Sequence, residues 1–266
     1  MQAIFKRLSH KIKKWTEGDL GIKINPAVPV ERIGSDYGGW IIPAGFFNPQ
    51  SICYLVGAGE DISFDLGLAY KFGCTAHIFD PTPRALAHLE KTIACIRASR
   101  PMPCSTCPDG FYPGYPVELA ARLQVHPVGI WDTDTTLQFF APEKEEHVSH
   151  SLVNLQHSGR AIEVPVRQLA SVMKELGHSQ IDLLKIDTEG AEYQILESII
   201  QDDLDVRVLC VEYDETAANH LDRHYLSRIR ASLTRLQNAG FMVIAKEPDC
   251  RNFTLLHTRY FDQRLA

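Results

Sequence analysis

Residues 181–192, with the sequence IDLLKIDTEGAE, constrain the fold of this chain more than any other segment. The half that precedes Asp187 is mostly apolar, which is typical of a strand buried on both faces of a parallel sheet. Gly190 then opens a helical pattern. Ligands of open α/β sheets bind at the carboxyl edge of the strands, where Asp187 would lie. We therefore predict that Asp187 is an active-site residue; the alternative is that the acids of this segment only stabilise the next helix.

The rest of the chain alternates strand-like runs with helical patterns. Main strands are predicted at 52–56, 74–79, 123–130, 182–186 and 206–211, and added short strands at 135–140 and 162–166. Helices are predicted after Asp61 and after Thr82, which can serve as their N-caps, and at 168–176, 191–200 and 221–237. The last two predicted strands, 241–245 and 253–257, are too close together for a parallel crossover, so we expect an antiparallel hairpin.

Composition narrows the class of protein. With 266 residues and 45% hydrophobic content, the chain can form one large α/β domain or one domain with a short extension. The formal charge of −6 argues against a nucleic-acid partner. No membrane-spanning run or secretory signal is evident, and Cys53, Cys74 and Cys210 lie in strand-like runs where buried thiols are common. We expect a cytoplasmic protein without a disulfide framework.

Two segments precede the main domain. Residues 1–20 have the pattern of a basic amphipathic helix, which we expect to pack on the domain or on a partner subunit of a homo-oligomer. The alternative, which we favour less, is a helix that lies on an anionic membrane. Residues 21–50 are rich in glycine and proline and read as an extension or lid with a short strand near Trp40. The main domain would then be 51–266.

The first predicted strand runs into Gly57 and Gly59, glycines that allow a close approach of the backbone to a ligand. A dinucleotide fingerprint would have a third glycine where Ile62 stands. Glu60 and Asp61 would repel phosphate. A cationic cofactor without phosphates, such as S-adenosylmethionine, fits this loop better; the alternative is a tight strand-to-helix turn without a ligand.

Further cofactor contacts are predicted at the ends of the next two strands. Asp80 ends the second strand, where an acid can accept hydrogen bonds from ribose hydroxyls, and Thr82 follows in the same turn. The alternative for Asp80 is a solvated turn residue. Trp131 could stack on the adenine base and Asp132 could bind its exocyclic amine; alternatively, Trp131 belongs to the core.

Six segments of the chain resemble the FkbM family of S-adenosylmethionine-dependent methyltransferases. They are DYGGWIIP (36–43), LVGAGEDISFDLGLAYKFGC (55–74), IFDPTP (78–83), HVSHSL (147–152), IDLLKIDTEGAEYQILE (181–197) and LCVEYDE (209–215). The resemblance implies a Rossmann-like class I methyltransferase fold: a mostly parallel seven-stranded sheet with a C-terminal antiparallel hairpin and helices on both faces. It also implies that Gly57, Gly59 and Asp80 hold the cofactor, with Asp187 at the methyl-transfer edge. Leu55 departs from the acid that many class I methyltransferases carry two residues before the first glycine; Glu60, Asp61 or backbone groups could replace it.

The resemblance further implies methylation of a hydroxyl on a sugar or on a small natural-product-like acceptor. An alcohol must lose its proton during attack, and His150 and Asp187 are the candidate bases. A third option, not favoured, is a Mg²⁺ ion held by Asp187, Glu189, Glu212 and Asp214. Cys104 and Cys107 form a single CxxC motif. We predict that they are two reduced loop thiols, because a structural zinc site requires four ligands.

Two other functions are also compatible with the sequence. One is a nicotinamide-dependent oxidoreductase, which Ile62 and the terminal hairpin disfavour. The other is a catalytically silent methyltransferase-like module that binds a partner through residues 1–20, which Leu55 supports.

Overall fold

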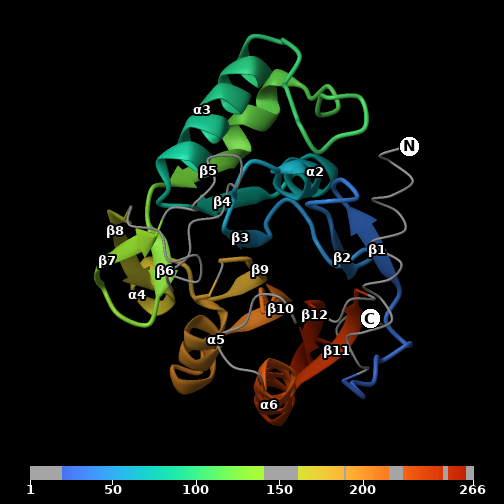
Figure 1. Cartoon of the computed structure of the whole chain (residues 1–266). Coiled ribbons are helices and arrows are strands. Elements are labelled where there is room, and N and C mark those ends of the chain that lie inside the picture. The colour runs from blue at the N-terminus through green and yellow to red at the C-terminus, as the bar shows by residue number, and fades with distance from the viewer. Residues whose placement is uncertain (1–19, 141–160, 189, 216–223, 248–250, 262–266) are drawn as a thin grey trace, which may run out of the picture.

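The computed structural model describes residues 20–140, 161–188, 190–215, 224–247 and 251–261 (Figure 1). The predicted N-terminal helix, His150 and Glu189 lie outside these residues. Within them, seven strands form the main sheet. Their order is β11 (Phe241–Lys246), β12 (Asn252–His257), β10 (Val206–Glu212), β9 (Ile181–Ile186), β3 (Ile52–Val56), β4 (Thr75–Phe79) and β5 (Leu123–His126).

The main sheet is parallel except for β12, which pairs antiparallel with both β10 and β11. The predicted mostly parallel sheet with a C-terminal antiparallel hairpin is therefore confirmed. The hairpin inserts β12 beside β10 and leaves β11 at the edge. Because only residues 247–251 join β11 to β12, the chain has no room for a helical crossover at this end.

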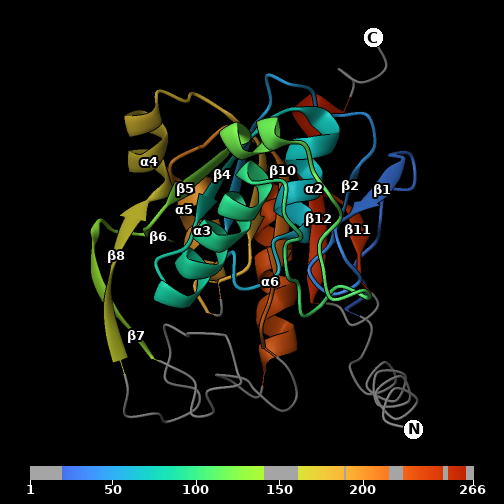
Figure 2. The same cartoon turned by 90° about the horizontal axis from the view of Figure 1, so that it is seen from above.

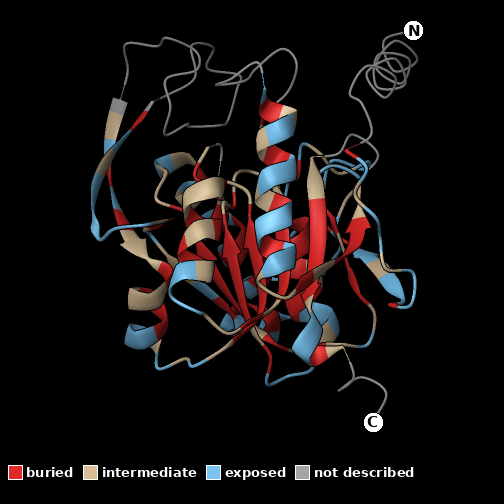
Figure 3. Cartoon of the chain, turned by 90° about the horizontal axis from the view of Figure 1, so that it is seen from below, coloured by how far each residue is buried: buried red, intermediate tan, exposed pale blue. Residues whose placement is uncertain are grey.

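Helices cover both faces of the sheet (Figures 1 and 2). One apolar cluster joins the sheet to α2 (Ser63–Phe72) and α3 (Pro83–Arg97). A second cluster joins the opposite face to α4 (Leu169–Leu176), α5 (Glu192–Gln201) and α6 (Tyr225–Asn238). All six residues of β9 are buried, as expected for a central strand between two helical layers, and Figure 3 shows the buried strands behind the exposed outer faces of the helices.

The strand that we predict at 123–130 is wrong in its extent. The structure ends β5 at His126 and starts β6 (Gly129–Trp131) in a different sheet, with β8 (Ala161–Gln168) and β7 (Thr135–Phe140). Pro127 lacks a backbone N–H and cannot continue the ladder. The N–H of Val128 turns back to the carbonyl oxygen of His126 at 2.8 Å instead. Residues after this turn therefore leave the main sheet.

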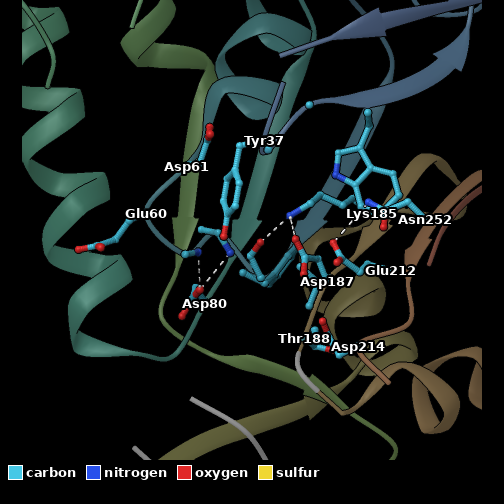
Figure 4. Close-up of a pocket in the computed structure, with 18 of the residues that line it drawn as sticks. Tyr37, Glu60, Asp61, Asp80, Lys185, Asp187, Thr188, Glu212, Asp214 and Asn252 are labelled. Atoms are coloured by element: carbon cyan, nitrogen blue, oxygen red, sulfur yellow. Dashed lines mark hydrogen bonds and ion pairs between the residues drawn. The ribbon is translucent and has the colours of Figure 1, made fainter. Parts of the chain in front are cut away.

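The segment before β3 forms a second small sheet, a hairpin of β1 (Val30–Ile33) and β2 (Trp40–Pro43). Trp40 and Ile42 are buried in the same apolar cluster as α2 and α3. The Thr254 hydroxyl of β12 donates to the carbonyl oxygen of Ile41 at 2.5 Å. The hairpin is thereby fixed to the sheet, and its turn carries Tyr37 toward the carboxyl ends of the strands (Figure 4).

Candidate functional site

The carboxyl ends of β4, β3 and β9 are joined by backbone hydrogen bonds beyond the ladder itself. The N–H of Gly57 donates to the carbonyl oxygen of Phe79 at 2.9 Å, and the N–H of Asp187 donates to that of Val56 at 3.1 Å. These bonds hold the glycine loop between the two neighbouring strand ends. At the sheet edge where the sequence predicts the site, the three strand ends are thus linked to one another by backbone hydrogen bonds.

The two loop glycines serve different needs. Gly57 has φ +85°, and a Cβ atom there would overlap the carbonyl oxygen of Asp187. Gly59 has φ +55°, but nothing lies within 4 Å of the position that its Cβ would take. Gly57 is therefore required for packing against β9, whereas Gly59 leaves open space at the edge of the sheet.

Asp80 is the hydrogen-bond centre of this loop. Its Oδ2 accepts the N–H groups of Ala58 at 3.0 Å and Gly59 at 3.2 Å. Its Oδ1 accepts the N–H of Thr82 at 2.9 Å and the hydroxyl of the same residue at 2.6 Å. These four donors match the about four acceptor positions of a carboxylate. Asp80 thus also fixes the shape of the glycine loop, a second task that no pattern in the sequence indicates.

The two acids that follow Gly59 have protein partners. Glu60 forms a two-point ion pair with Arg84, with distances of 2.7 and 2.8 Å. Asp61 accepts hydrogen bonds from the hydroxyls of Ser35 at 2.7 Å and Thr106 at 2.5 Å, and from the N–H of Ser63 at 2.9 Å. Burial by itself raises the pKa of Asp61, but the bonds from Ser63, Thr106 and Ser35 outweigh it and hold the pKa below its ordinary value.

The start of α2 differs from our prediction that Asp61 is the N-cap. The N-cap residue is Ile62, and Asp61 reaches the N–H of Ser63 from one position earlier. The N–H of Ile62 donates to the hydroxyl of Tyr112 at 3.0 Å. Two donors at this helix N-terminus are therefore already bonded within the protein, which leaves them unavailable to a pyrophosphate.

A cavity of about 580 Å³ opens along this edge. It extends from the glycine loop past Asp187 to the ends of β10 and β12, and Tyr37 lies over it (Figure 4). This volume is within the range of small-molecule sites. Among the described residues, the charged lining consists of eight acids and three bases: Asp36, Glu60, Asp61, Asp80, Asp187, Glu212, Asp214 and Glu247, with Arg32, Lys185 and Arg251.

Lys185 connects the two halves of the site. Its ammonium donates to the carbonyl oxygen of Gly57 at 2.6 Å and pairs with the Asp187 carboxylate at 3.1 Å (Figure 4). The Lys185 side chain is only 4% exposed, whereas that of Asp187 is 33% exposed. Burial lowers the pKa of Lys185, but the nearby charges of Asp187 and Asp65 outweigh it and raise the pKa above its ordinary value. Lys185 is therefore a fixed cation that holds the Asp187 carboxylate toward the cavity.

The acids at the end of β10 are paired as well. Arg251 contacts Glu212 at 2.8 Å and Asp214 at 3.0 Å. Asp187, Glu212 and Asp214 thus each face a cationic side chain, which competes with a metal ion for the same oxygens. In the part of the chain that the structure describes, no group of three or more His, Cys, Asp or Glu side chains is arranged to hold a metal.

The segments that form this site match a known protein family. The family model for the methyltransferase FkbM domain matches residues 56–243, which include the glycine loop, Asp80 and Asp187. The chain belongs to the FkbM methyltransferase family. The predicted family and fold class are confirmed.

Relatives of this FkbM family member include two proteins described as probable methyltransferase-like protein 24. The human protein is 47% identical over 160 residues, which cover 59% of this chain and 30% of the relative. The rat protein is 30% identical over 92 residues, which cover 35% of this chain and 24% of the relative. The chain thus spans less than a third of the length of these relatives.

Two solved structures are also similar. One is the methyltransferase FkbM from Methylobacillus flagellatus, with 13% identity, a TM-score of 0.45, and coverage of 79% of this chain and 44% of that chain. The other is the fibrillarin pre-rRNA processing protein of Methanococcus jannaschii, with 10% identity, a TM-score of 0.40, and coverage of 79% and 68%.

Most of the predicted site residues lie together in this FkbM domain. The cavity is lined by Gly57, Gly59, Glu60, Asp61, Asp80, Thr82 and Asp187. Trp131 is not among the described lining residues; it packs against the apolar side chains of the α4–α6 face and of β7 and β8. Its neighbour Ile130 and the β7 residue Phe139 line the cavity instead. The adenine contact predicted for Trp131 stays a prediction, as does the role of His150.

Sequence reasoning misses Lys185 as part of the site, because it treats the lysine as one residue of a buried strand. The signal is present, since a lysine in a mostly apolar central strand must have a buried partner. Tyr37 and Arg251 are missed for a different reason: their segments are distant in sequence and meet the cavity only in the folded chain.

One prediction about the cysteines is wrong. The structure joins Cys104 and Cys107 in a disulfide, where the sequence predicts two reduced loop thiols. The other described cysteines, Cys53, Cys74, Cys95 and Cys210, are free and buried. The short loop brings the two sulfurs together, which the sequence spacing alone does not decide.

None of the helices in the described ranges is long and apolar enough to cross a bilayer.

Proposed function

We propose that this FkbM family member is an S-adenosylmethionine-dependent O-methyltransferase that acts on a hydroxyl of a small acceptor such as a sugar or a natural-product-like molecule. The observation that carries the proposal is the open space beside Gly59, within a cavity whose wall includes both Asp80 and Asp187. The acidic excess of the lining suits a ligand that carries a sulfonium and an ammonium group.

The residues present fit such a cofactor. Gly59 leaves room for a ligand that a side chain would fill, and the backbone there is held by Asp80. Asp80 and Thr82 would face the ribose, Ile130 and Phe139 offer apolar surface for a base, and Glu60 and Asp61 lie at the start of α2. When bound, S-adenosylmethionine supplies a methyl group on a sulfonium, which is already activated for displacement.

The protein's own task is then alignment and proton removal. Asp187 lies between Asp80, on the glycine-loop side of the cavity, and Glu212 at the end of β10 (Figure 4). Its carboxylate is held by Lys185 and remains partly exposed, so it is placed to accept the proton of an acceptor hydroxyl. His150 remains the alternative base.

The two competing functions find less support. For a nicotinamide oxidoreductase, the donors at the start of α2 would have to bind pyrophosphate, but Ile62 and Ser63 already donate to Tyr112 and Asp61. For a silent module, Leu55 is the main argument. Leu55 is fully buried in the apolar cluster with α2 and α3 and is not among the described residues that line the cavity, so this position faces the core.

Calorimetry tests the proposal directly. We expect S-adenosylhomocysteine to bind with a micromolar dissociation constant and NADH not to bind at millimolar concentration. Asp187→Asn should retain the thermal midpoint and S-adenosylhomocysteine affinity, but lose at least about 100-fold in turnover with any acceptor that the wild type methylates. Absence of S-adenosylhomocysteine binding at millimolar concentration would refute the proposal. Cofactor binding without methyl transfer to a broad panel of alcohols would favour the silent module.

A further inference from the structure

The segment between α3 and η1 (Val117–Arg122) packs on the glycine loop. The hydroxyl of Tyr112 accepts the N–H of Ile62 at 3.0 Å and donates to the carbonyl oxygen of Glu60 at 3.3 Å. The segment is also tied to itself, because the N–H of Tyr112 donates to the carbonyl oxygen of Met102 at 2.9 Å. One wall of the cavity therefore depends on a connection without regular secondary structure.

The Cys104–Cys107 disulfide lies in this segment and encloses two residues that line the cavity, Ser105 and Thr106. Thr106 donates to Asp61 Oδ2 at 2.5 Å. The N–H of Cys107 donates to Cys104 Sγ at 3.1 Å, so the disulfide and the backbone around Thr106 form one compact turn. The covalent bond thus fixes the position from which Thr106 reaches Asp61.

Asp61 is also hydrogen-bonded to two other parts of the site, the start of α2 and the segment before Tyr37. It accepts the N–H of Ser63 at the start of α2 and the hydroxyl of Ser35. The Ser35 oxygen in turn accepts the N–H groups of Gly38 at 2.9 Å and Tyr37 at 3.2 Å. The disulfide is therefore connected through Thr106 and Asp61 to the turn that carries Tyr37 over the cavity (Figure 4).

This disulfide does not join residues that are distant in the sequence, as a disulfide that stabilises a whole fold does. It closes a loop with a sequence separation of 3, and the entropic stabilisation from a cross-link grows with loop length, so its effect on global stability is small. Cys104 is 1% exposed, whereas Cys107 is half-buried, so an external thiol can approach Cys107. The main effect of the disulfide is therefore local, on the wall of the cavity.

We propose that Cys104–Cys107 is a redox modification site whose oxidation state sets the affinity of the cavity for its nucleoside cofactor. The proposal rests on the proposed function for the identity of that cofactor. The oxidised form holds Thr106 on Asp61 and presents a preformed wall. In the reduced form the turn has lost its covalent closure, so that binding must also order Ser105 and Thr106.

The reduction is a thiol–disulfide exchange with a dithiol reductant. One thiolate of the reductant attacks Cys107 Sγ, the bond between the protein sulfurs breaks, and Cys104 leaves with the electron pair and takes up a proton. The second thiol of the reductant then attacks the reductant sulfur that is bonded to Cys107, and Cys107 is released as a thiol. The protein disulfide gains two electrons and two protons, and the reductant is oxidised to a disulfide.

The test compares S-adenosylhomocysteine affinity in the two states by calorimetry, with dithiothreitol as the dithiol and thiol titration of the unfolded protein to count reduced cysteines. We expect about 10-fold tighter binding to the oxidised form, the size of effect that loss of one hydrogen bond to a charged group produces. The Cys104→Ser/Cys107→Ser variant should bind like the reduced protein with or without dithiothreitol. Thr106→Val should weaken binding to a similar degree while its disulfide still forms.

Hydrogen exchange supplies a readout that needs no cofactor. Reduction should lower the protection of the amides of Ile62 and Ser63, and that of Gly38, with no change in the amides of β10. If S-adenosylhomocysteine binds equally well to both forms and these amides do not respond, the redox inference is overturned. If the amides respond but neither form binds S-adenosylhomocysteine, the proposed function fails and the redox link to the cavity wall stands.

Discussion

The carbonyl oxygen of Asp187 occupies the space that a Cβ atom would need at Gly57. The residue that follows β9 and the glycine loop are therefore in direct backbone contact. The N–H of Asp187 reinforces this contact through its bond to the carbonyl oxygen of Val56. A change on either side of the contact must alter the other.

We expect Gly57→Ala to destabilise the protein by at least about 3 kcal/mol, because backbone must move and φ is positive. The matched variant Gly59→Ala has open space around the new methyl group and should cost only about 1 kcal/mol from its positive φ. That methyl group enters the cavity, so S-adenosylhomocysteine affinity should fall while the fold persists. Urea unfolding and calorimetry measure the two effects; equal destabilisation by both substitutions would contradict the assignment.

Removal of the buried cation at Lys185 should be costly to the fold. Lys185→Met leaves Asp65, which is 1% exposed and whose Oδ1 has no hydrogen-bond partner among the described residues, without its nearby positive charge. We expect a loss of about 3–5 kcal/mol in the free energy of unfolding. The double variant Lys185→Met/Asp65→Asn should recover part of this loss, because it also removes the unbalanced carboxylate. Additive effects of the two substitutions in urea unfolding would show that the residues do not interact.

Asp80 holds the glycine loop through two of its four hydrogen bonds and Thr82 through the other two. Asp80→Asn replaces one acceptor oxygen by an NH₂ group that must face protein donors, so we expect a loss of about 1–3 kcal/mol in the free energy of unfolding. S-adenosylhomocysteine affinity should fall by about 100-fold, because the geometry of the glycine loop is affected. Asp202→Asn is the control, since Asp202 is exposed and is not among the described residues that line the cavity. Wild-type affinity in the Asp80 variant would remove Asp80 from the site.

A buried histidine should make the protein sensitive to acid. Burial, with the neighbouring His126 and His178, lowers the pKa of His77 from its ordinary value to about 4. Between pH 6.5 and 4 the unfolded chain therefore binds a proton that the folded chain does not, and stability falls as the pH falls. The contribution of this group amounts to about 3 kcal/mol across the window.

His77→Phe keeps a ring against Tyr54 and His126 but removes the titrating group. We expect the difference in unfolding free energy between pH 7 and pH 4 to be smaller in this variant than in the wild type. Asp65 acts in the opposite direction, because burial raises its pKa to about 6, so the comparison must be made variant against wild type at each pH. An unchanged pH dependence would show that His77 protonates normally in the folded state.

The sequence alone predicted the main-sheet strands that end at Val56, Phe79 and Ile186, and the terminal hairpin. Buried strands such as β9 are mostly apolar, glycine is favoured at a turn with positive φ such as Gly57, and a short link between two terminal strands permits only a hairpin. These are local properties, so the amino-acid pattern suffices to bring residues 52–59, 75–80 and 181–187 to one sheet edge.

Only the tertiary structure decided how charges and sulfurs are paired. Lys185 reaches Gly57, Arg251 reaches Glu212, and Thr106 reaches Asp61 from segments that are tens of residues or more apart in the chain. The same holds for the turn at Pro127, which moves Trp131 out of the main sheet, and for the closure of Cys104 with Cys107. Such contacts depend on where several elements come to rest together, and no periodicity in the sequence encodes the distance between two side chains.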